Sequence, residues 1–306
     1  MVIKLLTTIF TRPRVGLLCI VALLALPFCS IAEEKVFFDA LGREIRLGGS
    51  PARIVSLAPS ITEILYYLGL EERVVGVTQF SYYPPEAKSK PKVGSYRDVN
   101  VEKILELAPN LVIATADGNE PYVVELLEEA GIPVYVVNPR DIEEVISTIG
   151  KIGELCGVES RARKLCKALD ERLSAVKKKV AGLRKPLVFL QINLRPIMSV
   201  NRNTFHHDVI QTAGGINMTA DLASTYPRIS LEEVLKRKPE VILISCMARG
   251  GRFKKALERW MKWTDIPAVK NNRVHLVDSD LLDRPSPRLL DGLEVVAQLL
   301  HPELDW

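Results

Sequence analysis

The sequence has few of the residues that cross-link small domains through disulfides or bind metals. Its 306 residues include five cysteines and four histidines, and no Cys-x-x-Cys pair occurs, which argues against a thiolate zinc site. Common catalytic and nucleotide-binding motifs are also missing: Gly-x-Ser-x-Gly, the P-loop, His-Glu-x-x-His and the dinucleotide motif Gly-x-Gly-x-x-Gly. These absences argue against the best-known hydrolase, nucleotidase and metalloprotease classes.

An excess of one charge is missing as well. The chain has 41 Lys and Arg against 37 Asp and Glu, and three of the basic residues, Lys4, Arg12 and Arg14, precede the first acidic residue. The remainder is almost neutral, so its charge predicts no nucleic-acid partner. With 47% hydrophobic and 25% charged residues, the composition is globular. The length predicts two domains of about 100 to 150 residues each.

The first 32 residues have the pattern of a secretory signal peptide. Basic residues precede an uncharged run over residues 15–32, and Ser30 and Ala32 are the small residues that signal peptidase requires. We therefore predict cleavage after Ala32 and export of the chain. Two alternatives stay open: an uncleaved anchor, because the run approaches the length of a membrane span, and a lipoprotein attached through Cys29.

Export changes how the cysteines are interpreted. Without the leader, Cys156, Cys166 and Cys246 remain, so at most one pair can form. Cys156 and Cys166 flank a predicted turn at Gly157 and could form a disulfide. Cys246 follows an apolar run, which favours a buried thiol.

The rest of the chain alternates short apolar strands with helical patterns. A hairpin is expected at residues 36–47, and Ser60 and Glu63 have the spacing of a capping box at the start of a helix. Strands are expected at residues 53–57, 74–77, 111–114, 134–137, 187–192, 241–245 and 274–277, with helices at 101–107, 122–130, 208–213 and 254–263. Continuous apolar strands between helices predict α/β lobes with parallel sheets covered on both faces.

Two features predict a pair of similar lobes. Residues 158–182 contain no Gly or Pro before Gly182, and their apolar positions recur every three or four residues, which predicts one long amphipathic helix. Residues 101–113 and 231–243 share a helix, a proline and a buried strand, with Glu102 and Glu232 at equivalent positions. The sequence thus predicts two α/β lobes joined by a rigid helix.

Candidate binding residues follow the predicted strands, where open parallel sheets bind ligands. They combine flat aromatic rings with charged groups that can contact a ligand rim: Phe80, Tyr82, Tyr83, Tyr96 and Arg97 in the first half, and Tyr226, Asp280 and Arg284 in the second. His206 and His207 are adjacent and point about 100° apart on a helix. A helix-start or surface role and an axial contact to a bound metal complex both stay open for them.

Several motifs together resemble the substrate-binding proteins of ABC importers for cobalamin, haem and ferric siderophores. They lie at residues 53–60 (RIVSLAPS), 62–63 (TE), 83–85 (YPP), 93–96 (VGSY), 101–105 (VEKIL), 213–215 (AGG), 226–232 (YPRISLE) and 284–288 (RPSPR). The resemblance implies two Rossmann-like lobes and a single backbone helix, the architecture of helical-backbone periplasmic binding proteins. The expected boundaries are a signal peptide at 1–32, an N-terminal lobe at 33–157, the helix at 158–182 and a C-terminal lobe at 183–306.

The cobalamin-binding branch is the most similar. That resemblance implies a non-catalytic, periplasmic protein that needs no cofactor and carries cobalamin as its ligand, with Phe80, Tyr96, Tyr226, Asp280 and Arg284 in contact with it. Arg97 is a further candidate contact. Haem or a ferric siderophore is the near alternative, in which anionic groups would require Arg97, Arg195, Arg228 and Arg284. A metal-dependent enzyme using His206 or His207 is the distant one.

The resemblance also implies a macromolecular partner. Family members dock one acidic residue per lobe onto arginines of a dimeric permease, which works with its ATPase subunits, and Glu102 and Glu232 match those positions. Such a pair in two similar lobes suits a symmetric partner. We expect the binding protein itself to be a monomer.

Overall fold

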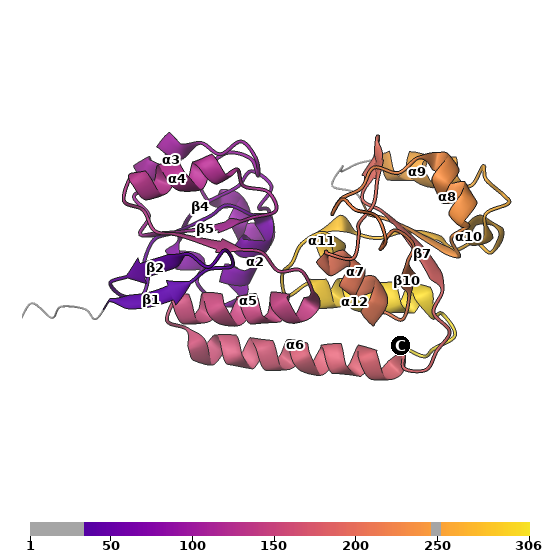
Figure 1. Ribbon diagram of the computed structural model, residues 1–306. Coiled ribbons are helices and arrows are strands. Elements are labelled where there is room, and N and C mark those ends of the chain that lie inside the picture. The colour runs from indigo at the N-terminus through magenta and orange to yellow at the C-terminus, as the bar shows by residue number, and fades with distance from the viewer. Residues whose placement is uncertain (1–33, 246–251) are drawn as a thin grey trace, which may run out of the picture. The chain divides into compact units, whose positions relative to one another are not determined.

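The computed structural model describes residues 34–245 and 252–306, of which Lys35–Trp306 form one compact unit (Figure 1). The predicted signal peptide and Cys246 lie outside the described residues. Within these two ranges, no helix combines the length and the apolar character needed to span a bilayer.

The first lobe has a four-stranded parallel sheet in the order β4-β3-β5-β6. Its strands are β3 (Ile54–Ser56), β4 (Val74–Val77), β5 (Leu111–Thr115) and β6 (Val134–Val137), and a β1 (Lys35–Phe38) and β2 (Glu44–Leu47) hairpin precedes them. Its helices are α2 (Pro59–Tyr67), η1 (Glu71–Arg73), η2 (Pro85–Ser89), α3 (Val101–Glu106), α4 (Pro121–Glu129) and α5 (Ile142–Leu155). The predicted hairpin and parallel sheet are confirmed.

The second lobe repeats this design with a parallel sheet in the order β10-β7-β11-β12. Its strands are β7 (Leu187–Gln191), β10 (Ile216–Asn217), β11 (Val241–Ile244) and β12 (Val274–Leu276), with a small hairpin of β8 (Asn193–Leu194) and β9 (Ile197–Met198). Its helices are α7 (Phe205–Thr212), α8 (Leu231–Arg237), α9 (Arg252–Trp260), α10 (Pro267–Lys270), α11 (Ser279–Leu282) and α12 (Leu289–Leu300).

Both faces of each sheet are buried, which explains the continuous apolar strands. Along β11, Val241 and Leu243 belong to one core cluster, whereas Ile242 belongs to another on the opposite face. The first of these clusters extends from the first sheet through α5, α6 and α12 to the second sheet. Successive residues of a strand point to opposite faces, so a sheet covered on both sides requires apolar residues at every position.

The long helix expected between the lobes is α6 (Glu159–Lys179), 21 residues that run beside α5 and α12 (Figure 1). It ends near Gly182, which has a positive φ of 77° that favours glycine. In the second lobe, Arg172 of α6 pairs with Asp291 and Glu294 of α12 at 2.6 and 2.9 Å. The helix thus contacts elements of both lobes.

The suggested disulfide is not formed, because the two helices pack antiparallel with another register. Cys166 of α6 lies opposite an earlier turn of α5, where its Sγ donates to the carbonyl oxygen of Ile146 at 3.3 Å. Cys156 follows the end of α5 and is buried in the core. Both thiols are free, and burial raises the pKa of Cys156 to about 12.

The sequence repeat corresponds to a repeat of backbone structure. Asn100 and Ser230 cap α3 and α8, each accepting a hydrogen bond from the backbone NH three residues later. After the two helices, Ala108 and Lys238 have positive φ values of 43° and 52°, each directly before a proline. Glu102 and Glu232 therefore occupy the same exposed position in two equivalent helices.

Candidate functional site

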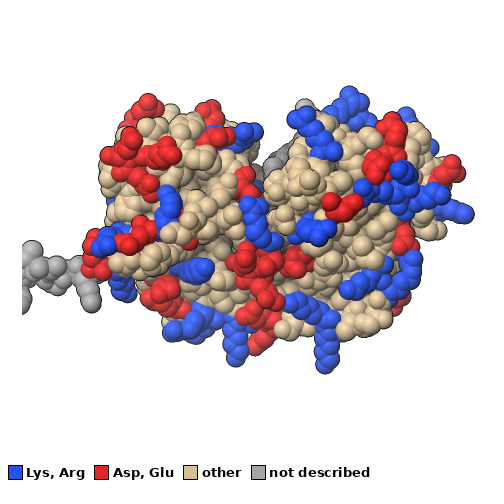
Figure 2. Space-filling model, in the orientation of Figure 1, with Lys and Arg blue, Asp and Glu red and all other residues tan. Residues whose placement is uncertain are grey.

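A cavity of about 590 Å³ lies at the carboxyl ends of the first lobe's strands, and Figure 2 shows the molecular surface hollowed between the two lobes. The cavity volume is within the range of small-molecule sites. The lining comes from segments after β3 and β4, from Tyr96, and from the chain after β12: Pro59, Ser60, Phe80, Tyr82, Tyr96, Ser279, Asp280, Asp283, Arg284 and Pro285. Both lobes therefore contribute to the wall of one cavity.

Four of the six predicted ligand-binding residues line this cavity. Phe80 is 49% exposed although it is apolar, and Tyr96, Asp280 and Arg284 complete the set. Burial raises the pKa of Tyr96 to about 12, with the Asp117 carboxylate acting in the same direction. The phenol therefore stays neutral at physiological pH and presents a flat, mainly apolar surface.

The position of Tyr96 depends on the turn after β5. The Asn119 side chain donates to the carbonyl oxygens of Tyr96 and Leu57 at 2.8 and 3.1 Å, and accepts from the Thr115 NH at 2.8 Å. A Cβ on Gly118 would lie 1.5 Å from the Tyr96 ring. A side chain at 118 and the present ring position are therefore mutually exclusive.

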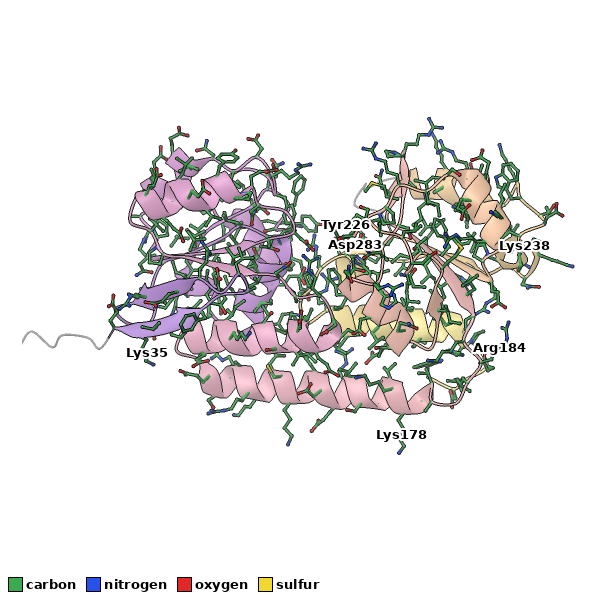
Figure 3. All side chains as sticks on the ribbon, in the orientation of Figure 1. Lys35, Lys178, Arg184, Tyr226, Lys238 and Asp283 are labelled. Carbon is green, nitrogen blue, oxygen red and sulfur yellow. The ribbon has the colours of Figure 1, made fainter. Side chains whose placement is uncertain are left out.

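The other two predicted contacts lie outside the cavity lining. Tyr226 reaches across to the first lobe, where its hydroxyl donates to Asp117 at 2.9 Å. In Figure 3, the labels of Tyr226 and Asp283 both lie on the side of the second lobe that faces the first. The Arg97 side chain is 80% exposed and pairs with Glu120 at 3.2 Å. The Arg97 guanidinium therefore already has a carboxylate partner at the surface.

The predicted capping box of Ser60 and Glu63 is wrong. Helix α2 has Ala58 as its N-cap, without a side-chain hydrogen bond, and Glu63 is fully buried. Its carboxylate accepts hydrogen bonds from Arg284 at 2.7 Å and from Ser286 at 2.6 Å. Burial raises its pKa, which those two bonds partly offset. The carboxylate serves a contact between segments 221 residues apart in the sequence.

Tyr82, which the sequence offered as a candidate but the family resemblance did not select, also lines the cavity. Its hydroxyl donates to Asp280 at 2.7 Å and accepts from Arg284. The Arg284 guanidinium also lies 4.6 Å from the centre of the Tyr82 ring. The available signal for Tyr82 was an aromatic residue in the loop after β4. The signal for Glu63 was a carboxylate within an apolar helical run, which needs a buried partner.

The two adjacent histidines have different partners. His206 is buried, and its Nε2 lies 3.1 Å from Asp283, whose other oxygen accepts from Ser245 at 3.0 Å. The Nδ1 of His207 lies 3.2 Å from the Asn217 amide. Both rings therefore contact polar side chains of the second lobe. Among the residues that the structure describes, no group of three or more His, Cys, Asp or Glu could hold a metal ion.

Known proteins are similar to this chain in sequence and fold. A family model described as "Periplasmic binding protein" matches residues 54–281. A vitamin B12-binding protein of Vibrio parahaemolyticus is 33% identical over 249 residues, which cover 80% of this chain and 88% of that protein.

Two solved structures are similar over most of the chain. The periplasmic vitamin B12-binding protein of Vibrio cholerae has a TM-score of 0.75 at 31% identity, covering 82% of this chain and 97% of the other. A periplasmic haem-binding protein of Pseudomonas aeruginosa also has a TM-score of 0.75, at 29% identity, with 83% and 94% covered. With two α/β lobes around a lined cavity and these similarities, the chain belongs to the periplasmic binding protein family, the substrate-binding components of ABC import.

Proposed function

We propose that this protein is exported to the periplasm, captures cobalamin in the cavity between its lobes and delivers it to an ABC importer permease. The observation that carries the proposal is the chemistry of the cavity wall, in which Phe80 and Tyr96 offer flat apolar surface beside the partly exposed Asp280 carboxylate. A corrin ring has a broad apolar face and a rim of uncharged amides. Carboxylate oxygens accept hydrogen bonds from such amides, and aromatic rings cover the face. The vitamin B12-binding relatives support the same ligand.

Haem is the second candidate, because a haem-binding protein has a fold equally similar to this one. Its two carboxylates would need cationic partners. Of the four arginines considered for that role, Arg97 is paired at the surface, and Arg195 and Arg228 are exposed. Arg284 lines the cavity, but its guanidinium is paired with Glu63 and Asp280. This distribution favours an amide-bearing ligand over an anionic one.

Delivery requires a docking surface, for which Glu102 and Glu232 are the candidates. Both are exposed at the second position of equivalent helices. In Figure 1, α3 and α8 lie on the side of the molecule away from α6, and Figure 2 shows acidic side chains gathered over α3 and α4. Two equivalent carboxylates in two equivalent lobes suit a symmetric, basic partner.

Uptake of labelled cyanocobalamin by cells that depend on this protein tests capture and delivery together. The double substitution Glu102→Ala with Glu232→Ala should lower uptake at least about tenfold, since it removes both charged contacts, while the purified variant still binds ligand. The control is Glu72→Ala with Glu171→Ala, which removes two exposed glutamates elsewhere. Uptake that matches the control would contradict docking through Glu102 and Glu232, and no uptake by the wild type would contradict cobalamin transport.

A further inference from the structure

The guanidinium of Arg284 lies in the cavity wall, yet both of its terminal nitrogens contact other groups of the protein. Nη1 donates to Glu63 at 2.7 Å, and Nη2 contacts Asp280 at 3.0 Å and the Tyr82 hydroxyl. The side chain is only 10% exposed. A ligand carboxylate would therefore meet a guanidinium whose charge is already compensated by two carboxylates of the protein.

Glu63 is the partner whose replacement would be most costly. It is completely buried behind the wall, and besides Arg284 and Ser286 it contacts Arg288 at 3.4 Å. A buried carboxylate that loses its cation keeps the full cost of desolvation, so a ligand anion cannot displace it cheaply. The pairing of Arg284 with Glu63 is therefore stable against competition from a ligand anion.

The charges of this cluster cancel. Glu63 and Asp280 carry two negative charges, and Arg284 and Arg288 carry two positive charges, all joined by contacts of 3.4 Å or less. Arg288 is further held over the Tyr83 ring, 3.9 Å from its centre. At the cavity surface, the Asp280 carboxylate is the more exposed member, with 19% of its side chain accessible against 10% for Arg284. This part of the wall therefore offers a hydrogen-bond acceptor while its positive charges are neutralised within the cluster.

We propose that Glu63 determines specificity: as the buried counter-charge of Arg284, it makes the cavity accept a tetrapyrrole with an uncharged amide rim and reject one with free carboxylates. The proposal rests on the proposed function and extends it to a residue outside the cavity lining. Rejection arises because an anionic ligand meets the Asp280 carboxylate and an arginine that is already neutralised. Specificity of this kind depends on an unfavourable contact with the wrong ligand.

The test is the substitution Glu63→Gln, which keeps the shape of the side chain and removes one negative charge. Asp280 is then the one carboxylate left in the cluster against Arg284 and Arg288, which leaves a net positive charge beside the cavity. Hemin, with its two carboxylates, should therefore bind at least about tenfold more tightly than to the wild type, a change of about 1.4 kcal/mol. The gain should shrink at high salt and disappear in the double variant Glu63→Gln with Arg284→Met. Glu128→Gln is the matched control, because Glu128 pairs with Arg43 at 2.8 Å outside the cavity.

Hemin affinity of folded Glu63→Gln that equals the wild-type value would overturn the proposal, as would a gain that persists without Arg284. If Glu63→Gln does not fold, Asp280→Asn removes the other counter-charge from the same guanidinium and must raise hemin affinity in the same salt-dependent way. Because the readout is hemin affinity, a wild type that fails to bind cyanocobalamin would contradict the proposed function separately.

Discussion

The position of Tyr96 in the cavity wall depends on two residues outside the cavity lining, Asn119 and Gly118. Its backbone is held by the Asn119 amide, and its ring occupies space that exists because residue 118 is glycine. A rigid aromatic surface loses little entropy when a ligand binds it. Asn119 and Gly118 are therefore positioning residues for the cavity wall.

The substitution Gly118→Ala should weaken ligand binding about tenfold or more, because the new Cβ would lie 1.5 Å from the present position of a ring carbon and a misplaced contact loses its binding energy. The ring is the end of a side chain that can rotate, so the melting temperature should change little. Calorimetric titration with cyanocobalamin measures the effect. Gly48→Ala is the control, since a Cβ added there would have nothing within 4 Å; equal affinities for the two variants would contradict the assigned role.

The sequence predicted the cavity residues that follow strands, because the carboxyl ends of parallel strands converge on one edge. Phe80, Tyr96 and Asp280 were found in this way. Glu63 was assigned to a capping box, since a local pattern was available and its true partner lies 221 residues away. A pairing over that distance leaves no trace in the spacing of a single sequence.

At the scale of elements, α5 packs against α6, and both helices contribute to the core cluster that the two lobes share. The two helices approach closely at Gly153, where an added Cβ would lie 2.2 Å from the Cβ of Ala162. The apolar positions of α5, among them Ile142, Val145 and Ile149, have helical spacing, so the sequence contained the signal for this helix although it was not predicted. The register of the pair, which separates Cys156 from Cys166, depends on contacts that spacing does not determine.

The substitution Gly153→Ala should destabilise the protein by about 1 to 3 kcal/mol, because it overpacks the helix contact. Gly150→Ala, one turn earlier, meets only Cys166 at 3.8 Å and should be neutral or stabilising by up to about 1 kcal/mol through helix propensity. Urea denaturation gives both free energies of unfolding. A Gly153→Ala variant as stable as Gly150→Ala would show that the helices do not pack as described.

At the scale of the whole molecule, contacts other than α6 also join the lobes. Glu63 binds Arg284 and Ser286, and the Asp208 carboxylate accepts from the Ile142 NH at the start of α5 at 3.0 Å. A shared core cluster continues beneath them. Joints of this kind permit small adjustments and resist a wide hinge opening.

Small-angle scattering of the free and the cyanocobalamin-saturated protein should therefore give the same radius of gyration within experimental error. The monomeric state, which is part of the same expectation, is measured in the same experiment from the forward scattering. A clear decrease of the radius of gyration on ligand addition would contradict the rigid connection between the lobes and would indicate hinge closure around the ligand.

Capture of cobalamin by the cavity is the central claim, and one measurement tests it most directly. The purified protein is mixed with cyanocobalamin, hemin and a ferric hydroxamate siderophore at equal concentrations and desalted, and the visible spectrum of the protein peak is recorded. We predict corrin absorbance equivalent to one cobalamin per chain. Haem or siderophore absorbance in its place, or a colourless protein peak, would contradict the account.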